Sequence, residues 1–236
     1  MGGFFSVEGP LFSGLGRLAD LFWLNILFIV CSLPIFTIGA STTALYYVTL
    51  KMVKNEEGHI TKSFFRAFKE NFRQSTLIWL MVMFVGALLF GDYLIMNGKL
   101  IDISAIPDLI RKAMLIMLLV AAFLIALTVR YVFPLLARFD NTIKNTIKNA
   151  LLISIRHLPF SALLLLIFGA AVAVFFLVPK LWVMYPIIMF SLVAFVSSFI
   201  FVKIFSYYIP KEEEKDPDDF VLGEINREDL NPDTDK

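Results

Sequence analysis

The sequence predicts an all-α membrane protein with about six transmembrane helices, two cytoplasmic interfacial helices and both termini in the cytoplasm. Three observations predict this class: an apolar composition, repeated runs of about 20 apolar residues, and basic residues gathered in two loops. Of the 236 residues, 58% are hydrophobic and only 17% are charged. Soluble domains are about 45–50% apolar and about 25% charged. The chain therefore has too little polar surface to cover a water-facing globule.

Residues 18–50 contain the first two predicted spans, at about 18–33 and 35–50, arranged as a short hairpin. One continuous helix over this stretch would be about 50 Å long at about 1.5 Å per residue. The hydrocarbon core of a bilayer is only about 30 Å thick. Pro34 and Gly39 interrupt helices and are expected to supply the break. Two full crossings are our interpretation, and a re-entrant hairpin is the alternative.

An amphipathic basic helix is predicted over about 60–74. Phenylalanines recur every four residues on one side of it, at Phe64, Phe68 and Phe72. Basic residues follow a similar spacing on the opposite side: Lys62, Arg66, Lys69 and Arg73. Such a helix lies in the headgroup plane with its apolar face toward the lipid. It leads into the third span, about 76–96, where Gly86 and Gly91 would allow close helix approach.

Four further elements complete a membrane domain that we expect to cover residues 1–209. Three of them are spans, at about 113–137, 158–178 and 181–208. The fourth is a second interfacial helix, at about 141–156. Residues 210–236 carry 11 acidic residues and four basic ones: Lys211, Lys215, Arg227 and Lys236. An acidic segment with few apolar residues is typical of a disordered tail. Its scattered apolar residues leave a partner-binding peptide as the alternative.

The orientation follows from the positions of lysine and arginine, which favour the cytoplasmic side of a membrane. If residues 51–73 are cytoplasmic, six spans place the segments 1–18 and 138–157 on the same side. These inside segments carry 11 basic residues, whereas the predicted outside loops carry four. Both termini are therefore expected in the cytoplasm. Phenylalanine and isoleucine accompany the basic residues, which favours anionic lipid over nucleic acid as the partner of these loops.

Polar residues within the predicted spans are the first candidates for a functional site, because charges at membrane depth are costly and often functional. Asp20 and Arg130 fall at similar depths on the cytoplasmic side of the predicted topology, and Asn25 lies in the same span as Asp20. They would either line a polar pocket for a solute or form a buried ion pair that joins the first span to the fourth. Both interpretations remain open at this stage.

The hairpin break supplies the second set of candidates: Thr37, Ser41 and Thr42. A helix start rich in serine and threonine can present free backbone N–H groups to an anion or a sugar hydroxyl. Ordinary capping of the second helix by Thr37 or Ser41 is the alternative. The sequence contains no recognisable catalytic motif and no metal-ligand spacing. We therefore expect no enzyme activity, no metal site and no cofactor.

Three segments carry a resemblance to a known family. They read SLPIFTIGASTTALYYVTLKMV at 32–53, SFFRAFKENFRQ at 63–74 and RYVFPLLARFDNTIKNTIKNAL at 130–151. In this order they resemble the YesL-like family of bacterial integral membrane proteins, over roughly residues 1–209. The resemblance implies the bacterial cytoplasmic membrane and a physiological link to carbohydrate uptake and utilisation. Carbohydrate transporter subunits are the partners that we expect under the first of the two functions below. It supplies no catalytic residues.

Two functions are compatible with these observations. The first is an accessory or regulatory component of carbohydrate uptake, suggested by the basic surface helices, the acidic tail and the scarcity of deep polar groups. The second is a transporter or channel for a small solute, a sugar or an organic anion, suggested by the broken hairpin and the polar residues within the spans. Neither is decided by the sequence.

Overall fold

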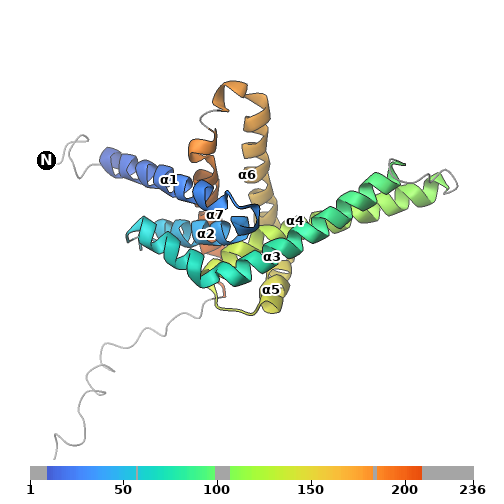
Figure 1. Cartoon of the computed structure of the whole chain (residues 1–236), viewed down its shortest axis with the longest axis horizontal. Coiled ribbons are helices and arrows are strands. Elements are labelled where there is room, and N and C mark those ends of the chain that lie inside the picture. The colour runs from blue at the N-terminus through green and yellow to red at the C-terminus, as the bar shows by residue number, and fades with distance from the viewer. Residues whose placement is uncertain (1–9, 57, 99–106, 183–184, 209–236) are drawn as a thin grey trace, which may run out of the picture. The chain divides into compact units, whose positions relative to one another are not determined.

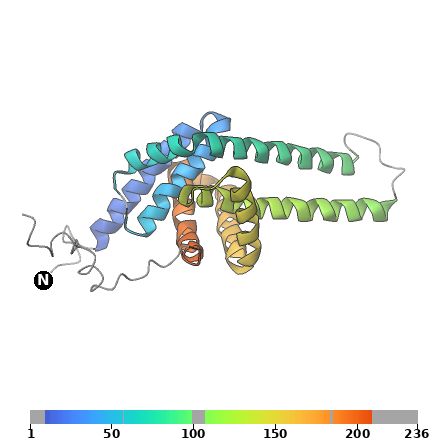
Figure 2. The same cartoon turned by 90° about the horizontal axis from the view of Figure 1, so that it is seen from below.

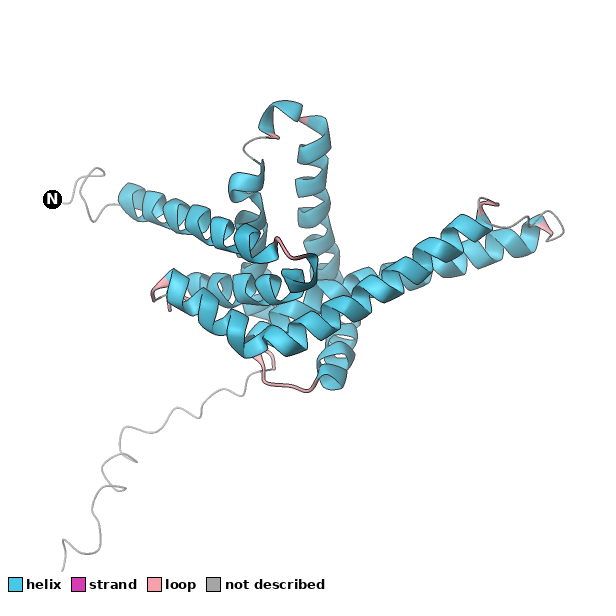
Figure 3. Cartoon of the chain, in the orientation of Figure 1, coloured by secondary structure: helices cyan, strands magenta, loops and turns pink. Residues whose placement is uncertain are grey.

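The computed structural model describes residues 10–56, 58–98, 107–182 and 185–208. These residues form α-helices joined by short loops, and no strand occurs among them, so the predicted all-α class is confirmed (Figures 1 and 3). The helices are α1 (Pro10–Ser32), α2 (Ile38–Val53), α3 (Ile60–Met96), α4 (Asp108–Arg138), α5 (Ile143–Arg156), α6 (Leu158–Leu177) and α7 (Tyr185–Phe205), with 3₁₀ turns η1 (Ile35–Thr37) and η2 (Pro179–Leu181). The predicted acidic tail lies outside the described residues. The chain divides into two compact units, 1–202 and 203–236, and the contacts below all belong to the first.

Five of the helices are long and apolar enough to cross a membrane, which identifies a multi-pass membrane protein. The qualifying stretches are Gly14–Ser32, Ile60–Met96, Asp108–Arg138, Leu158–Leu177 and Ile187–Phe205. The helix α2 is not among them, because its 16 residues extend only about 24 Å at about 1.5 Å per residue. Six crossings and cytoplasmic termini therefore stay predictions.

The expected break between the first two helices is present, but its details differ from the prediction. The helix α1 ends at Ser32, and η1 follows Pro34 before α2 begins. Thr37 occupies the N-cap position of α2 without capping it. Its hydroxyl instead donates to the carbonyl oxygens of Cys31 and Pro34, each at 2.6 Å. Threonine thereby satisfies carbonyl groups freed where α1 ends.

The helix α2 lies at the centre of the first unit and contacts α1, α3 and α4. Eleven of its 16 residues are buried, so α2 has little surface left for lipid. Buried hydroxyl pairs join it to its neighbours: Thr43 Oγ1 lies 2.9 Å from Ser75 Oγ of α3, and Thr49 Oγ1 lies 2.8 Å from Ser198 Oγ of α7. Small residues and cross-helix hydrogen bonds are the usual means of association in membranes.

Gly39 lies within the first turn of α2, where it allows close packing, and the break itself falls earlier, around Pro34. A Cβ atom added at Gly39 would lie 2.5 Å from the Ser75 carbonyl oxygen and 2.7 Å from Trp79 Cβ. The backbones of α2 and α3 therefore approach closely at this point. The indole nitrogen of Trp79 adds a hydrogen bond of 2.8 Å to the Ile35 carbonyl oxygen.

The helix α3 runs without interruption through residue 75, where we expected a surface helix to give way to a span. Its 37 residues extend about 55 Å at about 1.5 Å per residue. The stretch between the two predicted elements contains neither proline nor glycine, so nothing in the backbone ends the helix there. Phe64 and Ala67 are fully buried against protein. This part of the phenylalanine face thus packs inside the unit.

The distal parts of α3 and α4 form an arm, which we define as residues 80–96 and 108–124. Both views show these two helices side by side, extending away from the other helices (Figures 1 and 2). Only 6% of the most apolar window is buried in each of α3 and α4, against 17–33% in the other three candidate spans. Gly86 and Gly91 face open space, so they do not mediate the α3–α4 contact.

The helix α5, Ile143–Arg156, falls within the range 141–156 of the second predicted interfacial helix, and its position at a membrane surface stays a prediction. Thr142 caps it, with the Asn145 backbone N–H donating to Thr142 Oγ1 at 3.4 Å. Its inner face is buried, at Thr146, Ala150, Ile153 and Ser154. The Ser161 hydroxyl of α6 donates to the Ser154 carbonyl oxygen at 2.7 Å, which ties α6 to the end of α5.

Candidate functional site

A cavity of about 190 Å³ surrounds Arg130 within the helical bundle. Its walls come from α1, α2, α4, α6 and α7, so segments far apart in the sequence build it together. The lining residues are Phe28, Thr42, Leu45, Tyr46, Arg130, Phe168, Ala171, Met189, Phe190, Val193 and Ala194. Most of them are apolar, and Arg130 contributes the charge.

The Arg130 guanidinium is the most unusual group in this cavity. Its Nε and Nη2 atoms are buried and have no hydrogen-bond partner among the described residues. The guanidinium carbon lies 4.9 Å from the centroid of the Phe168 ring, within the range of a cation–π contact. Hydrogen-bond donors that are buried without a partner destabilise a folded protein. The cavity therefore offers a cation with unused donors to an anionic group.

Two hydroxyl-bearing residues share the cavity with Arg130. Thr42 Oγ1 donates to the Ile38 carbonyl oxygen at 2.7 Å, which leaves its oxygen available as an acceptor. Tyr46 is almost fully buried and places its ring edge against Phe201, with the ring centroids 5.6 Å apart. A ligand that fits this site would combine an anionic group for Arg130 with an apolar or hydroxylated body.

Asp20 does not line the cavity of Arg130. It lies in a second pocket, of about 640 Å³, between α1 and the start of α3, together with His59 and Lys62. The nearby indole nitrogen of Trp23 donates to Thr61 Oγ1 at 2.8 Å, which joins the two helices at this point. Asp20 and Arg130 thus line separate pockets.

Two further predicted polar residues are fully buried in the bundle. Asn25 is fully buried, and its Oδ1 accepts a hydrogen bond of 2.9 Å from the Ser191 backbone N–H of α7. Ser41 is fully buried too, and its hydroxyl has no hydrogen-bond partner among the described residues. Neither residue lines the Arg130 cavity. Of the predicted pocket residues, the structure brings Thr42 and Arg130 together.

The basic residues predicted for the membrane surface are all exposed along one side of α3: Lys62, Arg66, Lys69 and Arg73. Arg66 Nε pairs with Glu70 Oε1 at 2.9 Å, one helical turn away. The other three cations extend this exposed stripe over about three turns of helix. Contact of this stripe with lipid headgroups stays a prediction.

The aromatic walls of the cavity were not predicted from the sequence. Phe28, Phe168 and Phe190 belong to a chain with 25 phenylalanines, and no local pattern distinguishes them from lipid-facing ones. Tyr46 stands in the Ala-Leu-Tyr-Tyr segment that carries the family resemblance. This segment is the sequence signal that could have pointed to Tyr46 as a wall residue. No group of three or more potential metal ligands occurs in the described parts of the chain.

Two Bacillus subtilis (strain 168) proteins are similar to this chain. One, described as "Uncharacterized protein YteU", is 27% identical over 177 residues, covering 75% of this chain and 74% of that protein. The other, described as "Uncharacterized protein YesL", is 32% identical over 164 residues, covering 69% of this chain and 72% of that protein. The chain belongs to the YesL-like family.

Residues 21–93 of this YesL-like protein also match the family described as "Protein of unknown function, DUF624". That match covers about half of α1, all of α2 and nearly all of α3, including the close contact at Gly39. Arg130 lies beyond the end of this match. No solved structure matches the chain.

Proposed function

We propose that this YesL-like protein is an accessory or regulatory component of carbohydrate uptake in the bacterial cytoplasmic membrane. The observation that carries the proposal is the arm formed by α3 and α4. Its two helices are the least covered candidate spans, and large apolar side chains surround them. The most exposed include Phe84, Phe90, Leu109, Ile116, Met117 and Leu119.

An apolar two-helix arm offers a long surface to the spans of a second membrane protein. Helix association in lipid depends on close van der Waals packing and small residues, and Gly86 and Gly91 lie open on this surface. The link to carbohydrate comes from the family resemblance, which makes a transporter subunit the proposed partner. In the proposed orientation both termini are cytoplasmic, and the exposed basic stripe of α3 faces the anionic inner leaflet.

Photo-crosslinking in living cells tests this proposal. A benzophenone amino acid at Phe84, which is 66% exposed on the arm, should yield a covalent adduct with a membrane subunit of a sugar uptake system. The same residue at Phe176, which is 69% exposed on α6, serves as the matched control and should give no such adduct. Adducts are identified by mass spectrometry after growth on different sugars. Adducts with lipid alone at Phe84 would contradict the proposal.

The cavity around Arg130 favours a second candidate function, transport of a small organic anion such as a sugar acid. The supporting observation is that the Nε and Nη2 atoms of Arg130 are buried and have no hydrogen-bond partner among the described residues. A carboxylate on the solute would accept hydrogen bonds from these atoms. Charged hydrogen bonds contribute about 1.5–3 kcal/mol, and the aromatic walls would contact the rest of the solute.

Uptake into proteoliposomes tests this second function with labelled monosaccharides, oligosaccharides and sugar acids. Arg130→Ala should lower uptake of the preferred anion at least about tenfold, because about 1.4 kcal/mol of binding corresponds to a factor of ten. Arg138→Ala removes an exposed arginine two turns further along the same helix and should leave uptake unchanged. Equal uptake by Arg130→Ala and the unmodified protein, at equal expression, would exclude the cavity as a transport site.

A further inference from the structure

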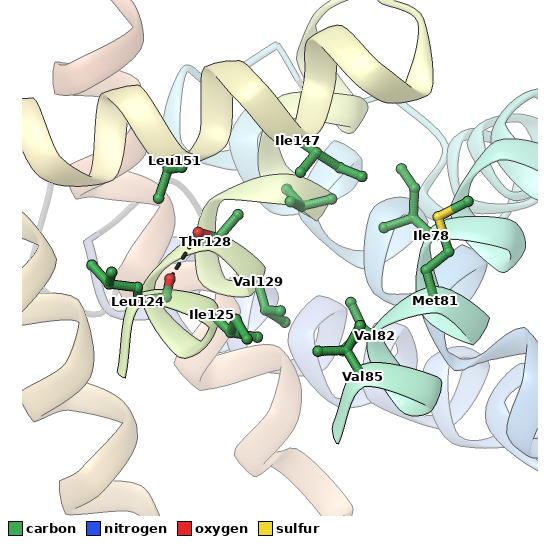
Figure 4. A pocket seen from close by; sticks show the side chains of 11 residues that line it. Ile78, Met81, Val82, Val85, Leu124, Ile125, Thr128, Val129, Ile147 and Leu151 are labelled. Carbon is green, nitrogen blue, oxygen red and sulfur yellow. Dashed lines mark hydrogen bonds between the residues drawn. The ribbon is translucent and has the colours of Figure 1, made fainter. Parts of the chain in front are cut away.

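A third pocket, separate from the cavity of Arg130 and from the pocket of Asp20, lies where α3, α4 and α5 meet (Figure 4). Its volume is about 320 Å³, within the range of about 300–1,000 Å³ found for small-molecule sites. The lining residues come from three helices: Ile78, Met81, Val82 and Val85 of α3, Leu124, Ile125, Thr128, Val129 and Val132 of α4, and Ile147 and Leu151 of α5.

The interior of this pocket presents hydrocarbon almost throughout. Thr128 is the single polar residue in the lining, and its hydroxyl donates to the Leu124 carbonyl oxygen at 2.8 Å (Figure 4). The pocket is reachable from outside, because Met81 and Leu124 on its wall are 44% and 38% exposed. An occupant must therefore be apolar where it enters, as a lipid acyl chain is.

The α5 wall adds positive charge beside the apolar interior. Lys144 precedes Ile147 by three residues and Lys148 precedes Leu151 by three, so both lysines lie on the helix surface next to the lining residues. Both lysines are exposed. The N-terminus of α5 also carries the positive end of the helix dipole, which favours phosphate groups.

A hydrogen bond holds the start of α5 against α3. Gln74 Nε2 of α3 donates to the Asn141 carbonyl oxygen at 2.5 Å, just before α5 begins. Gln74 lies one turn before Ile78, on the side of α3 that faces the pocket. The start of α5, with its lysines, is therefore fixed against the same face of α3 that forms the apolar wall.

We propose that this pocket binds one anionic phospholipid, with an acyl chain between α3 and α4 and the phosphate at Lys144 and Lys148. A zwitterionic lipid supplies the same acyl chain, but its headgroup carries no net negative charge to attract the lysines. Charge complementarity at the rim thus selects among membrane lipids, while the apolar interior holds the chain. The site is distinct from the exposed basic stripe of α3.

Native mass spectrometry of the full-length protein in mild detergent tests the site, with palmitoyl-oleoyl phosphatidylglycerol and the matching phosphatidylcholine as probes. The unmodified protein should retain one phosphatidylglycerol more tightly than phosphatidylcholine. Each lysine near an anionic lipid contributes about 1 kcal/mol, equivalent to about a fivefold change in affinity. The double variant Lys144→Gln, Lys148→Gln should therefore bind phosphatidylglycerol about 25-fold more weakly.

Two control pairs make the test specific. Lys62→Gln, Lys69→Gln removes the same charge from the exposed stripe of α3 and should leave the tight lipid in place. Val82→Phe and Val85→Phe fill the pocket and should release it, whereas Leu88→Phe, one turn outside the lining, should not. Equal retention of the two lipids, or equal losses in the two lysine pairs, would overturn the proposal. If the pocket variants fail to fold, the lysine pairs alone decide.

Discussion

Replacing Phe201 with alanine should lower the free energy of unfolding of the membrane domain by about 2–4 kcal/mol. Phe201 is fully buried, and its ring meets the rings of Tyr46 and Tyr131 edge to face, with centroids 5.6 and 5.3 Å away. It thereby joins α7 to α2 and α4. Truncating such a residue costs about 3–5 kcal/mol in water-soluble proteins. We expect somewhat less here, since lipid solvates a released phenylalanine better than water does.

The measurement is the midpoint of thermal unfolding in detergent, followed by loss of the monodisperse peak in size-exclusion chromatography. Phe199→Ala is the matched control, because Phe199 lies two residues away on the same helix and is 52% exposed. That variant should unfold within about a degree of the unmodified protein, since exposed substitutions change stability by about 0.5 kcal/mol or less. Equal midpoints for both variants would show that the aromatic cluster contributes little.

Gly39→Ala is expected to give the second largest loss of stability, by overpacking the contact between α2 and α3. The new methyl group would lie 2.5 Å from the Ser75 carbonyl oxygen and 3.2 Å from Phe133 Cε1. The Ser75 oxygen is backbone, so α3 itself must move to make room. Overpacking of this kind costs about 1–3 kcal/mol, and the adjacent hydrogen bond between Thr43 and Ser75 would be strained as well.

The same substitution at Gly86 provides the control for Gly39→Ala. A Cβ atom at Gly86 meets no other atom within 4 Å, and alanine favours a helix over glycine by about 0.5–1 kcal/mol. Gly86→Ala should therefore leave the unfolding midpoint unchanged or raise it, in the same chromatographic assay. A normal midpoint for Gly39→Ala would mean that α2 and α3 are further apart than described.

Part of this architecture could be predicted from the sequence because it depends on local chemistry. The helical class, the break at Pro34 and the exposed basic stripe of α3 each follow from residue type and spacing. Arg130 could also be selected as a candidate from the sequence, because a cation inside an apolar run is costly wherever the helix packs. These features need no knowledge of which helices are neighbours.

The remaining features depend on the tertiary arrangement. Hydropathy does not distinguish a helix facing lipid from one inside a bundle, so the burial of α2 could not be predicted from its composition. Depth alone suggested that Asp20 and Arg130 could meet, but depth says nothing about which side of each helix faces the other. The aromatic walls around Arg130 and the role of Gly39 likewise depend on neighbours distant in the sequence.

The unbroken length of α3 has a mechanical consequence. Its first half is anchored in the core by Phe64, Ala67 and Ser75, while its second half forms one side of the arm. About 21 residues, or about 31 Å of helix, separate Ser75 from Met96. A tilt of about 10° around Ser75 would therefore displace the tip of the arm by about 5 Å. A small change in core packing around Ser75 would thus be amplified along α3 into a larger displacement at the end of the arm.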